Sequence, residues 1–281
     1  MVDIEMDMLR SPLFIGGAPR SGTTALLQVL NSNVNAYVSS EENLLNMIKV
    51  FGKSLGTRER RASTLAGGMR ELSERETLTA DNIHSHNFTE KSLWPAIRYL
   101  YKWHHKQSNS DEPLILWGDK LPNYYKELET VLSVSRVKYL HITRNPYDVV
   151  NSMLRRTEMS KQGKDWWKAI TDVENMIDSW ASAYKAMRKV ESATNTLHIQ
   201  YESLVFEFDK TVAQINAFIG VDLAYQNVMV DDPAKHYGRS YITDEVQQLI
   251  GSNVHVMHYV KRFSDNTDYP SVAASLGMFK H

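Results

Sequence analysis

Short apolar runs alternate along the chain with longer stretches in which apolar residues recur at helical spacing. Runs with the length of buried strands occur at residues 12–17, 36–39, 113–118, 137–143 and 196–200, the one at 36–39 being the weakest. Helical spacing predicts helices at residues 22–31, 42–51, 88–106, 123–134, 146–157, 166–190, 209–219 and 243–261. Strands that alternate with helices predict an α/β fold, a three-layer sandwich whose mostly parallel central sheet is flanked by helices. Ligands of such sheets bind beyond the carboxyl ends of the strands, which here are segments 17–24 and 143–146.

The first apolar run leads into a glycine-rich loop, LFIGGAPRSGTT at residues 13–24. Backbone N–H groups of such a loop, together with the positive end of the following helix, attract an anion. Counted from Gly17, the spacing is that of a P-loop, with Thr23 in place of the lysine that reaches the terminal phosphates of ATP. Because the cation of this loop is Arg20 instead, the loop predicts a P-loop-like site for a phosphate-bearing ligand other than Mg-ATP.

A second candidate anion site follows a later strand, in YLHITRNPYDVVNSML at residues 139–154. The strand is expected to leave Arg144 at its carboxyl edge, and Pro146 suits the first turn of the following helix. Ser152 is then about two turns into that helix, where its hydroxyl can face an anion that Arg144 also binds. The alternative is an ion pair of Arg144 with Asp148 and an exposed serine.

Composition narrows the class of protein. The chain has 32 basic and 33 acidic residues, a formal charge of −1, so no global field attracts nucleic acid or an anionic membrane. Cysteine is absent, which excludes disulfides and thiolate metal sites. The first residues lack the apolar region of a signal peptide, and no stretch approaches 18 apolar residues. We therefore expect a soluble, cytoplasmic protein without a membrane span.

The length of 281 residues is compatible with a single α/β domain over residues 1–281. Within it, residues 52–110 are expected to form a helical insert or lid on the acceptor side. Residues 263–281, rich in Ser, Asp and Gly, are expected to form a C-terminal tail. The sequence leaves the oligomeric state open, a homo-oligomer included.

The two anion motifs carry a family resemblance. PRSGTT at residues 19–24, followed by RNPYDVVNS at residues 144–152, resembles the cofactor-binding motifs of sulfotransferases that depend on 3′-phosphoadenosine 5′-phosphosulfate (PAPS). The resemblance implies a 5′-phosphosulfate site and a separate 3′-phosphate site. It assigns Arg20, Ser21, Gly22, Thr23 and Thr24 to the 5′ site, and Arg144 and Ser152 to the 3′ site.

Further similarity to the bacterial and tyrosylprotein branches extends to about residue 205. WGDKLPNYY at residues 117–125 resembles a strand-end Lys-x-Pro motif, which implies that Lys120 polarises the transferring group. The alternative interpretation of Lys120 is a solvated cation paired with Asp119. IQYESLV at residues 199–205 resembles a segment near the 3′ site and adds Tyr201. Beyond it no loop closing the adenine side is evident; Arg239 is our candidate, with Lys235 and Ser240 beside it.

A general base is expected near the end of the second strand. Glu41 stands 21 residues after Arg20, the offset of the catalytic glutamate in the branches that this chain resembles. Glu42 is the alternative base. The residues alone leave another interpretation open, in which both glutamates cap a helix that starts near Asn43.

Histidines and aromatic residues offer further candidates. His84, His86, His104 and His105 are competing bases, but H-x-H without a third spaced ligand is weak evidence for a metal. His104 and His105 are expected on the polar side of a helix, and His141 in the core. An aromatic wall for an apolar acceptor can come from Tyr37, Trp94, Trp103, Trp166 and Trp167.

The combined interpretation is a metal-free sulfotransferase that moves a sulfuryl group from PAPS to a hydroxyl, or in second place an amine. Arg20, Lys120 and Glu41 would be its catalytic residues, and adenosine 3′,5′-bisphosphate (PAP) its product. A polyanionic acceptor would call for a basic groove, and RERR at residues 58–61 is the only dense basic cluster in the sequence. A small-molecule or lipid-like acceptor is therefore expected. The alternatives are an ATP-dependent kinase of a small metabolite and a non-catalytic nucleotide-binding module.

Overall fold

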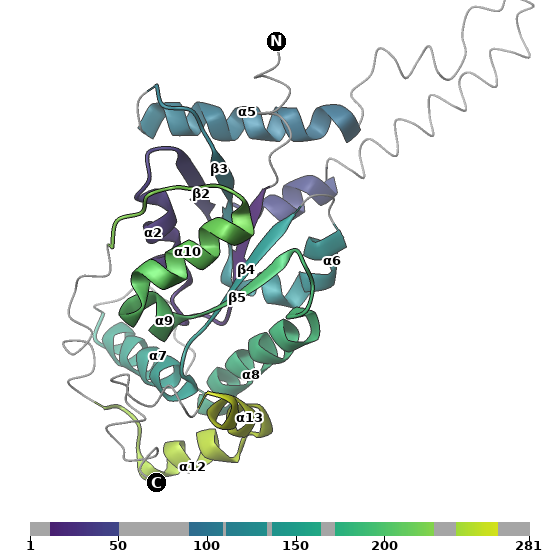
Figure 1. The fold of residues 1–281 in the computed structure, drawn as a ribbon. Coiled ribbons are helices and arrows are strands. Elements are labelled where there is room, and N and C mark those ends of the chain that lie inside the picture. Colours follow the sequence, from purple (N-terminus) through teal and green to yellow (C-terminus); the bar gives the residue numbers. More distant parts are fainter. Residues whose placement is uncertain are drawn as a thin grey trace, which may run out of the picture.

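Five parallel strands form the centre of the protein, which is described here from a computed structural model (Figure 1). The structure describes residues 12–50, 90–108, 111–133, 137–163, 172–227 and 240–263. The strands are β1 (Leu13–Gly16), β2 (Ala36–Ser40), β3 (Leu116–Lys120), β4 (Lys138–Thr143) and β5 (Thr196–Gln200), in the order β2-β3-β1-β4-β5. Each of these pairings is parallel, so the expected α/β fold with a mostly parallel sheet is confirmed.

Helices cover both faces of this sheet. Their bounds are α2 (Thr23–Asn31), residues 44–50, α5 (Glu90–Ser108), η1 (Pro122–Glu127), α6 (Leu128–Ser133), α7 (Pro146–Lys161), α8 (Val173–Val190), α9 (Tyr201–Phe206), α10 (Phe208–Ile219), α12 (Asp244–Ser252) and α13 (Val254–Arg262). Side chains of β1 alternate between the two faces, as the pleat requires. Leu13 and Ile15 pack in a core with α2, α9 and α10, whereas Phe14 packs in a second core with α5, η1 and α6.

A third apolar cluster joins α7, α8, α12 and α13, at the bottom of Figure 1. Its buried aromatics stack closely, with Trp180 and Tyr259 in an edge-to-face pair whose ring centroids are 5.3 Å apart. Such pairs contribute about 0.5–1.5 kcal/mol beyond the area that they bury. This cluster fixes the position of α7, which carries Ser152.

Several elements differ from those expected. The strand expected at 113–118 is Leu116–Lys120, and it buries the charged residues Asp119 and Lys120 because both find partners. The helix expected at 123–134 begins as the 3₁₀ segment η1. The helix expected at 243–261 is broken at Asn253, whose Oδ1 accepts from His255 N and caps α13.

The division of the chain into a single domain with a helical insert and a C-terminal tail remains a prediction. Much of the expected insert 52–110, namely residues 52–89, 109 and 110, lies outside the described residues, as do residues 264–281 of the expected tail. Among the helices that are described, none is both long and apolar enough to cross a membrane.

Candidate functional site

The glycine-rich loop after β1 lies against the backbone of its neighbours. Gly17 N donates a hydrogen bond to Pro122 O at 3.1 Å. A Cβ at Gly17 would lie 2.3 Å from Ile142 O, and the residue has a φ of 154°. Only glycine fits so close to the carbonyl oxygen of Ile142, near the end of β4, and the loop therefore lies tightly between η1 and β4.

The loop then turns into α2 through two left-handed residues, Arg20 with φ 72° and Gly22 with φ 98°. Gly22 precedes α2, and no side chain caps that helix end. The first N–H groups of a helix have no partner within it, so this end has the donors and the dipole that bind anions. Ser21 is fully buried, and its Oγ has no hydrogen-bond partner among the described residues.

Tyr201, at the start of α9, lies between the two anion motifs. A Cβ at Gly22 would be 2.3 Å from Tyr201 Cδ2, so the loop touches one side of the ring. The guanidinium carbon of Arg144 lies 4.4 Å from the ring centroid, within the range of a cation–π contact. The main chain of Arg144 is held as well, because Trp180 Nε1 donates to its carbonyl oxygen at 2.9 Å.

The two motifs also meet directly. Arg20 Nε donates to Ser152 Oγ at 3.2 Å, across a sequence separation of 132 residues. Next to Ser152, Asn151 Oδ1 accepts from Tyr241 N at 2.7 Å, so the segment before α12 passes beside this end of the site. Ser240 is exposed, while Lys235 and Arg239 lie outside the described residues and stay predictions.

Glu202 is a buried carboxyl group close enough to Arg144 to interact with its charge. The sequence interpretation did not select it. Glu202 Oε1 accepts from Asn145 N at 2.9 Å, at the start of α7, whereas Oε2 is buried without a partner among the described residues. Burial raises the pKa of Glu202 to about 7, against the opposing effects of the Asn145 hydrogen bond and the Arg144 charge. The available signal was its place next to Tyr201, directly after the strand predicted at residues 196–200.

Glu41 and Lys120 form an ion pair at the ends of β2 and β3. Lys120 Nζ donates to Glu41 Oε1 at 2.7 Å, and Glu41 N donates to Lys120 O at 2.7 Å. The side chain of Lys120 is 2% exposed and that of Glu41 55% exposed. The pair therefore presents a solvent-accessible carboxylate over a buried cation. Since Lys120 is aligned with Ile15 of β1, it lies on the strand next to the glycine-rich loop.

The alternative interpretation of Lys120 is wrong. Lys120 is a buried residue bonded to Glu41, not a solvated cation paired with Asp119. The helix after β2 begins at residue 44, and Asn43 caps it by accepting from Asn46 N at 3.3 Å. Glu42 is exposed, and its N–H donates to Asp119 Oδ1.

The histidines fall in different environments. His104 is exposed, but the expectation for His105 is wrong: it is buried, with Nε2 2.6 Å from Val34 O. His141 is buried as expected, and burial keeps its pKa well below the usual range. His84 and His86 lie outside the described residues. Within the described part of the chain, no cluster of three or more His, Asp or Glu residues suits a metal ion.

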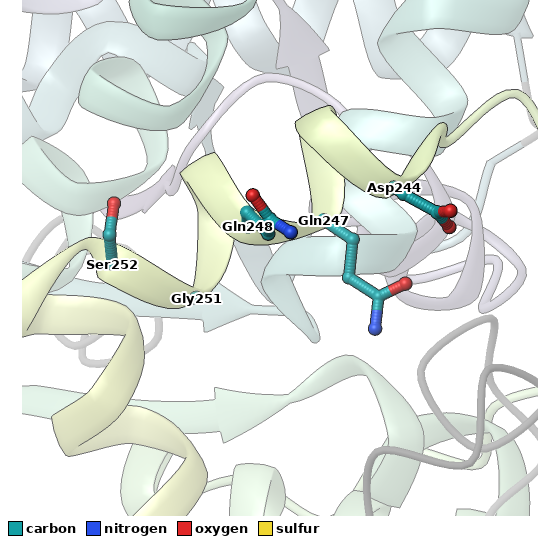
Figure 2. A pocket seen from close by; sticks show the side chains of 5 residues that line it. All are labelled: Asp244, Gln247, Gln248, Gly251 and Ser252. Carbon is teal, nitrogen blue, oxygen red and sulfur yellow. The ribbon is translucent and has the colours of Figure 1, made fainter.

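Of the expected aromatic wall, Tyr37 stacks on His104 with ring centroids 6.1 Å apart, and Trp103 is 52% exposed. Trp166 and Trp167 lie outside the described residues, and the wall remains a prediction. A cavity of about 580 Å³ lies along α12 (Figure 2). It is lined by Asp244, Gln247, Gln248, Gly251 and Ser252, all from one helix and none a candidate site residue.

The fold is that of an α/β protein whose candidate anion site lies at the carboxyl edge of a parallel sheet. The sequence model described as "Sulfotransferase family" matches residues 12–225, and the chain belongs to this family. Its expected activity class, a sulfotransferase, is thereby supported, and the kinase alternative is not favoured. No curated protein matches the sequence.

Solved structures with a similar fold come from several sources. The sulfotransferase domain from the curacin biosynthetic pathway is 17% identical, with a TM-score of 0.49 over 91% of this chain and 98% of that one. The sulfotransferase domain of the Synechococcus PCC 7002 olefin synthase is 20% identical, with a TM-score of 0.48 over 91% and 96%. Mouse sulfotransferase SULT7A1 complexed with PAP is 15% identical, with a TM-score of 0.42 over 93% and 68%.

Proposed function

We propose that this sulfotransferase moves the sulfuryl group of PAPS to a hydroxyl, or in second place an amine, of a small-molecule or lipid-like acceptor and releases PAP. The observation that carries the proposal is the hydrogen bond from Arg20 to Ser152. It brings together two motifs that are far apart in the sequence, and a donor with phosphate groups at both its 5′ and 3′ positions would use both.

The residues present suit such a donor. The uncapped N-terminus of α2, the Ser21 hydroxyl and the Arg20 guanidinium offer donors to a 5′-phosphosulfate. Thr23 and Thr24 supply the first N–H groups of the helix. The 3′-phosphate would bind Arg144 and Ser152, and the Tyr201 ring would hold the Arg144 guanidinium through a cation–π contact. Arg239 remains a candidate for the same side.

The chemistry demands an in-line acceptor and neutralised negative charge, which positioned cations and amides supply. Lys120 and Arg20 would balance charge on the transferring group and the leaving phosphate. Glu41 would take the proton of the acceptor hydroxyl, because its carboxylate is exposed and held by Lys120. Glu42 is the alternative base.

The acceptor is inferred from the net charge of the chain and from two aromatic residues. A formal charge of −1 supports a small or lipid-like acceptor over nucleic acid or another polyanion, which would need a basic groove. The exposed Trp103 and the Tyr37 ring support an apolar or phenolic molecule. The proposal requires no metal.

Isothermal titration calorimetry with PAP tests the donor assignment, with ADP and Mg-ATP as matched nucleotides. We expect binding of PAP and much weaker binding of ADP, which lacks a 3′-phosphate. Failure of PAP to bind at high micromolar concentration, or tighter binding of Mg-ATP, would contradict the proposal.

A further inference from the structure

Asp119 is a fully buried carboxylate beside the Glu41–Lys120 pair, and it accepts four hydrogen bonds. Ser39 Oγ, at 2.6 Å, and Glu42 N, at 3.2 Å, donate to Oδ1. Leu44 N, at 3.3 Å, and the Tyr124 hydroxyl donate to Oδ2. All four partners are donors, and only an ionised carboxylate has enough acceptor positions for them.

The two hydroxyl donors belong to a larger buried network, in which Ser39 Oγ also lies 3.2 Å from Gly118 O. Burial raises the pKa of Tyr124 well above its usual value, and the nearby Asp119 charge adds to the shift. The Ser39 hydroxyl also lies 2.9 Å from Tyr101 OH, whose pKa burial raises in the same way. Both tyrosines therefore stay protonated, and α5, which carries Tyr101, is tied to this network.

The two amide donors belong to a strained loop. Glu41 has a φ of 67° and Asn43 a φ of 54°, in the left-handed region that costs non-glycine residues about 1 kcal/mol or more each. Asp119 holds the amides of the residues that follow these two, Glu42 and Leu44. Left-handed conformations of non-glycine residues persist where several surrounding contacts hold the backbone in place.

The last two residues of β3 thus hold the loop that follows β2. Successive residues of a strand point to opposite faces, so Asp119 and Lys120 reach the loop differently. Lys120 binds Glu41 through both its ammonium group and its carbonyl oxygen, and Asp119 binds the next amides. Without Asp119, nothing else among the described contacts fixes both Glu42 N and Leu44 N.

We propose that Asp119 is a positioning residue for sulfuryl transfer, which fixes loop 41–44 and thereby holds the Glu41 carboxylate over Lys120. Its effect on turnover rests on the proposed function, whereas its effect on the loop does not. Asp119 contacts neither acceptor nor donor in this scheme, and it acts through the backbone.

The first test is amide hydrogen exchange of Asp119→Asn by NMR, with the exposed Asp178→Asn as matched control. The asparagine amide presents N–H groups to partners that are themselves donors. We expect exchange at Glu42 and Leu44 to accelerate about tenfold or more, while β1 and β4 stay protected as in the parent protein. Unchanged protection at Glu42 and Leu44 would overturn the proposal, and this result is independent of any activity.

The second test is a double-mutant cycle of Asp119→Asn with Glu41→Gln. PAP release from PAPS is followed with 4-nitrophenol as probe acceptor, and PAP affinity by calorimetry. If Asp119 acts through Glu41, Asp119→Asn lowers kcat about tenfold alone and less than about twofold in the Glu41→Gln background, with PAP affinity retained. Equal losses in both backgrounds overturn the positioning role. Failure of the parent protein to bind PAP counts against the proposed function, and the exchange experiment then decides the role of Asp119.

Discussion

Lys120 Nζ lies 2.7 Å from Glu41 Oε1, and the two side chains differ in exposure, at 2% for the lysine and 55% for the glutamate. A buried ammonium group is stable only with a partner, because an unpaired charge in the interior costs several kcal/mol. The same bond leaves the carboxylate at the surface, where an acceptor can approach. One contact thus serves both the fold and the proposed chemistry.

Glu41→Gln is expected to lower kcat for sulfuryl transfer about 10²- to 10⁴-fold, the range typical for loss of a general base. Glutamine keeps an oxygen that accepts from Lys120 but cannot take a proton from the acceptor. PAP affinity, measured by calorimetry, should stay within about twofold, since the donor site is formed by other residues. Glu42→Gln is the matched control, and a comparable loss in that variant alone would make Glu42 the base.

Gly22→Ala is expected to weaken both folding and PAP binding. The new Cβ would lie 2.3 Å from the Tyr201 ring, at a φ of 98°. Gly163→Ala is a matched control, because Gly163 also has a positive φ, 69°, but its Cβ would meet nothing within 4 Å. Both variants should lose about 1 kcal/mol in urea unfolding from backbone strain. Only Gly22→Ala should lose more stability than this and bind PAP less tightly. Equal PAP affinity of the two variants would place Tyr201 away from the ligand.

Arg144→Ala is expected to weaken the discrimination of PAPS from adenosine 5′-phosphosulfate, which lacks the 3′-phosphate. Loss of a charge-assisted hydrogen bond costs about 1.5–3 kcal/mol, or roughly 10- to 100-fold in Kd. Competition against PAP, followed by calorimetry, measures both ligands. The exposed Arg155→Ala, on the helix that follows Arg144, is the control for net charge. Equal losses for the two ligands would contradict a 3′-phosphate site at Arg144.

That the segments of Arg20 and Ser152 lie at the same edge of the sheet could be anticipated because each motif is local. Each follows a buried strand, and parallel strands bring their carboxyl ends to one edge of the sheet. The position of the helix that carries Ser152 followed from Pro146 and from helical spacing. For these segments, short-range pattern and sheet topology were enough to predict the arrangement.

The partners of Asp119 could not be anticipated in the same way. An Asp-Lys pair is typical of a loop, so the apolar run 113–118 set the expected strand too early. The bonds to Ser39 and Glu42 depend on the register of β2 against β3, which aligns Ser39 with Asp119. His105 is buried for a similar reason, since its acceptor, Val34 O, is 71 residues away. Hydrophobic periodicity carries no information about such distant polar partners.

Glu202 gives the folded protein a pH-dependent stability. Burial raises its pKa from the ordinary 4.5 to about 7, so between these values the folded protein keeps a proton that the unfolded chain releases. The free energy of unfolding should therefore fall as pH rises through this window and change no further from this group above it. The full effect is about 3 kcal/mol, from the shift and about 1.4 kcal/mol per unit.

Glu202→Gln tests this prediction, because glutamine resembles the protonated acid and still accepts from Asn145 N. Urea unfolding from about pH 5 to about pH 8 should give similar stabilities at the acid end and a more stable variant at the alkaline end. The exposed Glu112→Gln should follow the parent protein throughout. A constant difference between Glu202→Gln and the parent protein at every pH would show that the proton on Glu202 does not set the slope. Then the buried carboxyl would be charged in the folded state, held by the Asn145 amide and the Arg144 cation.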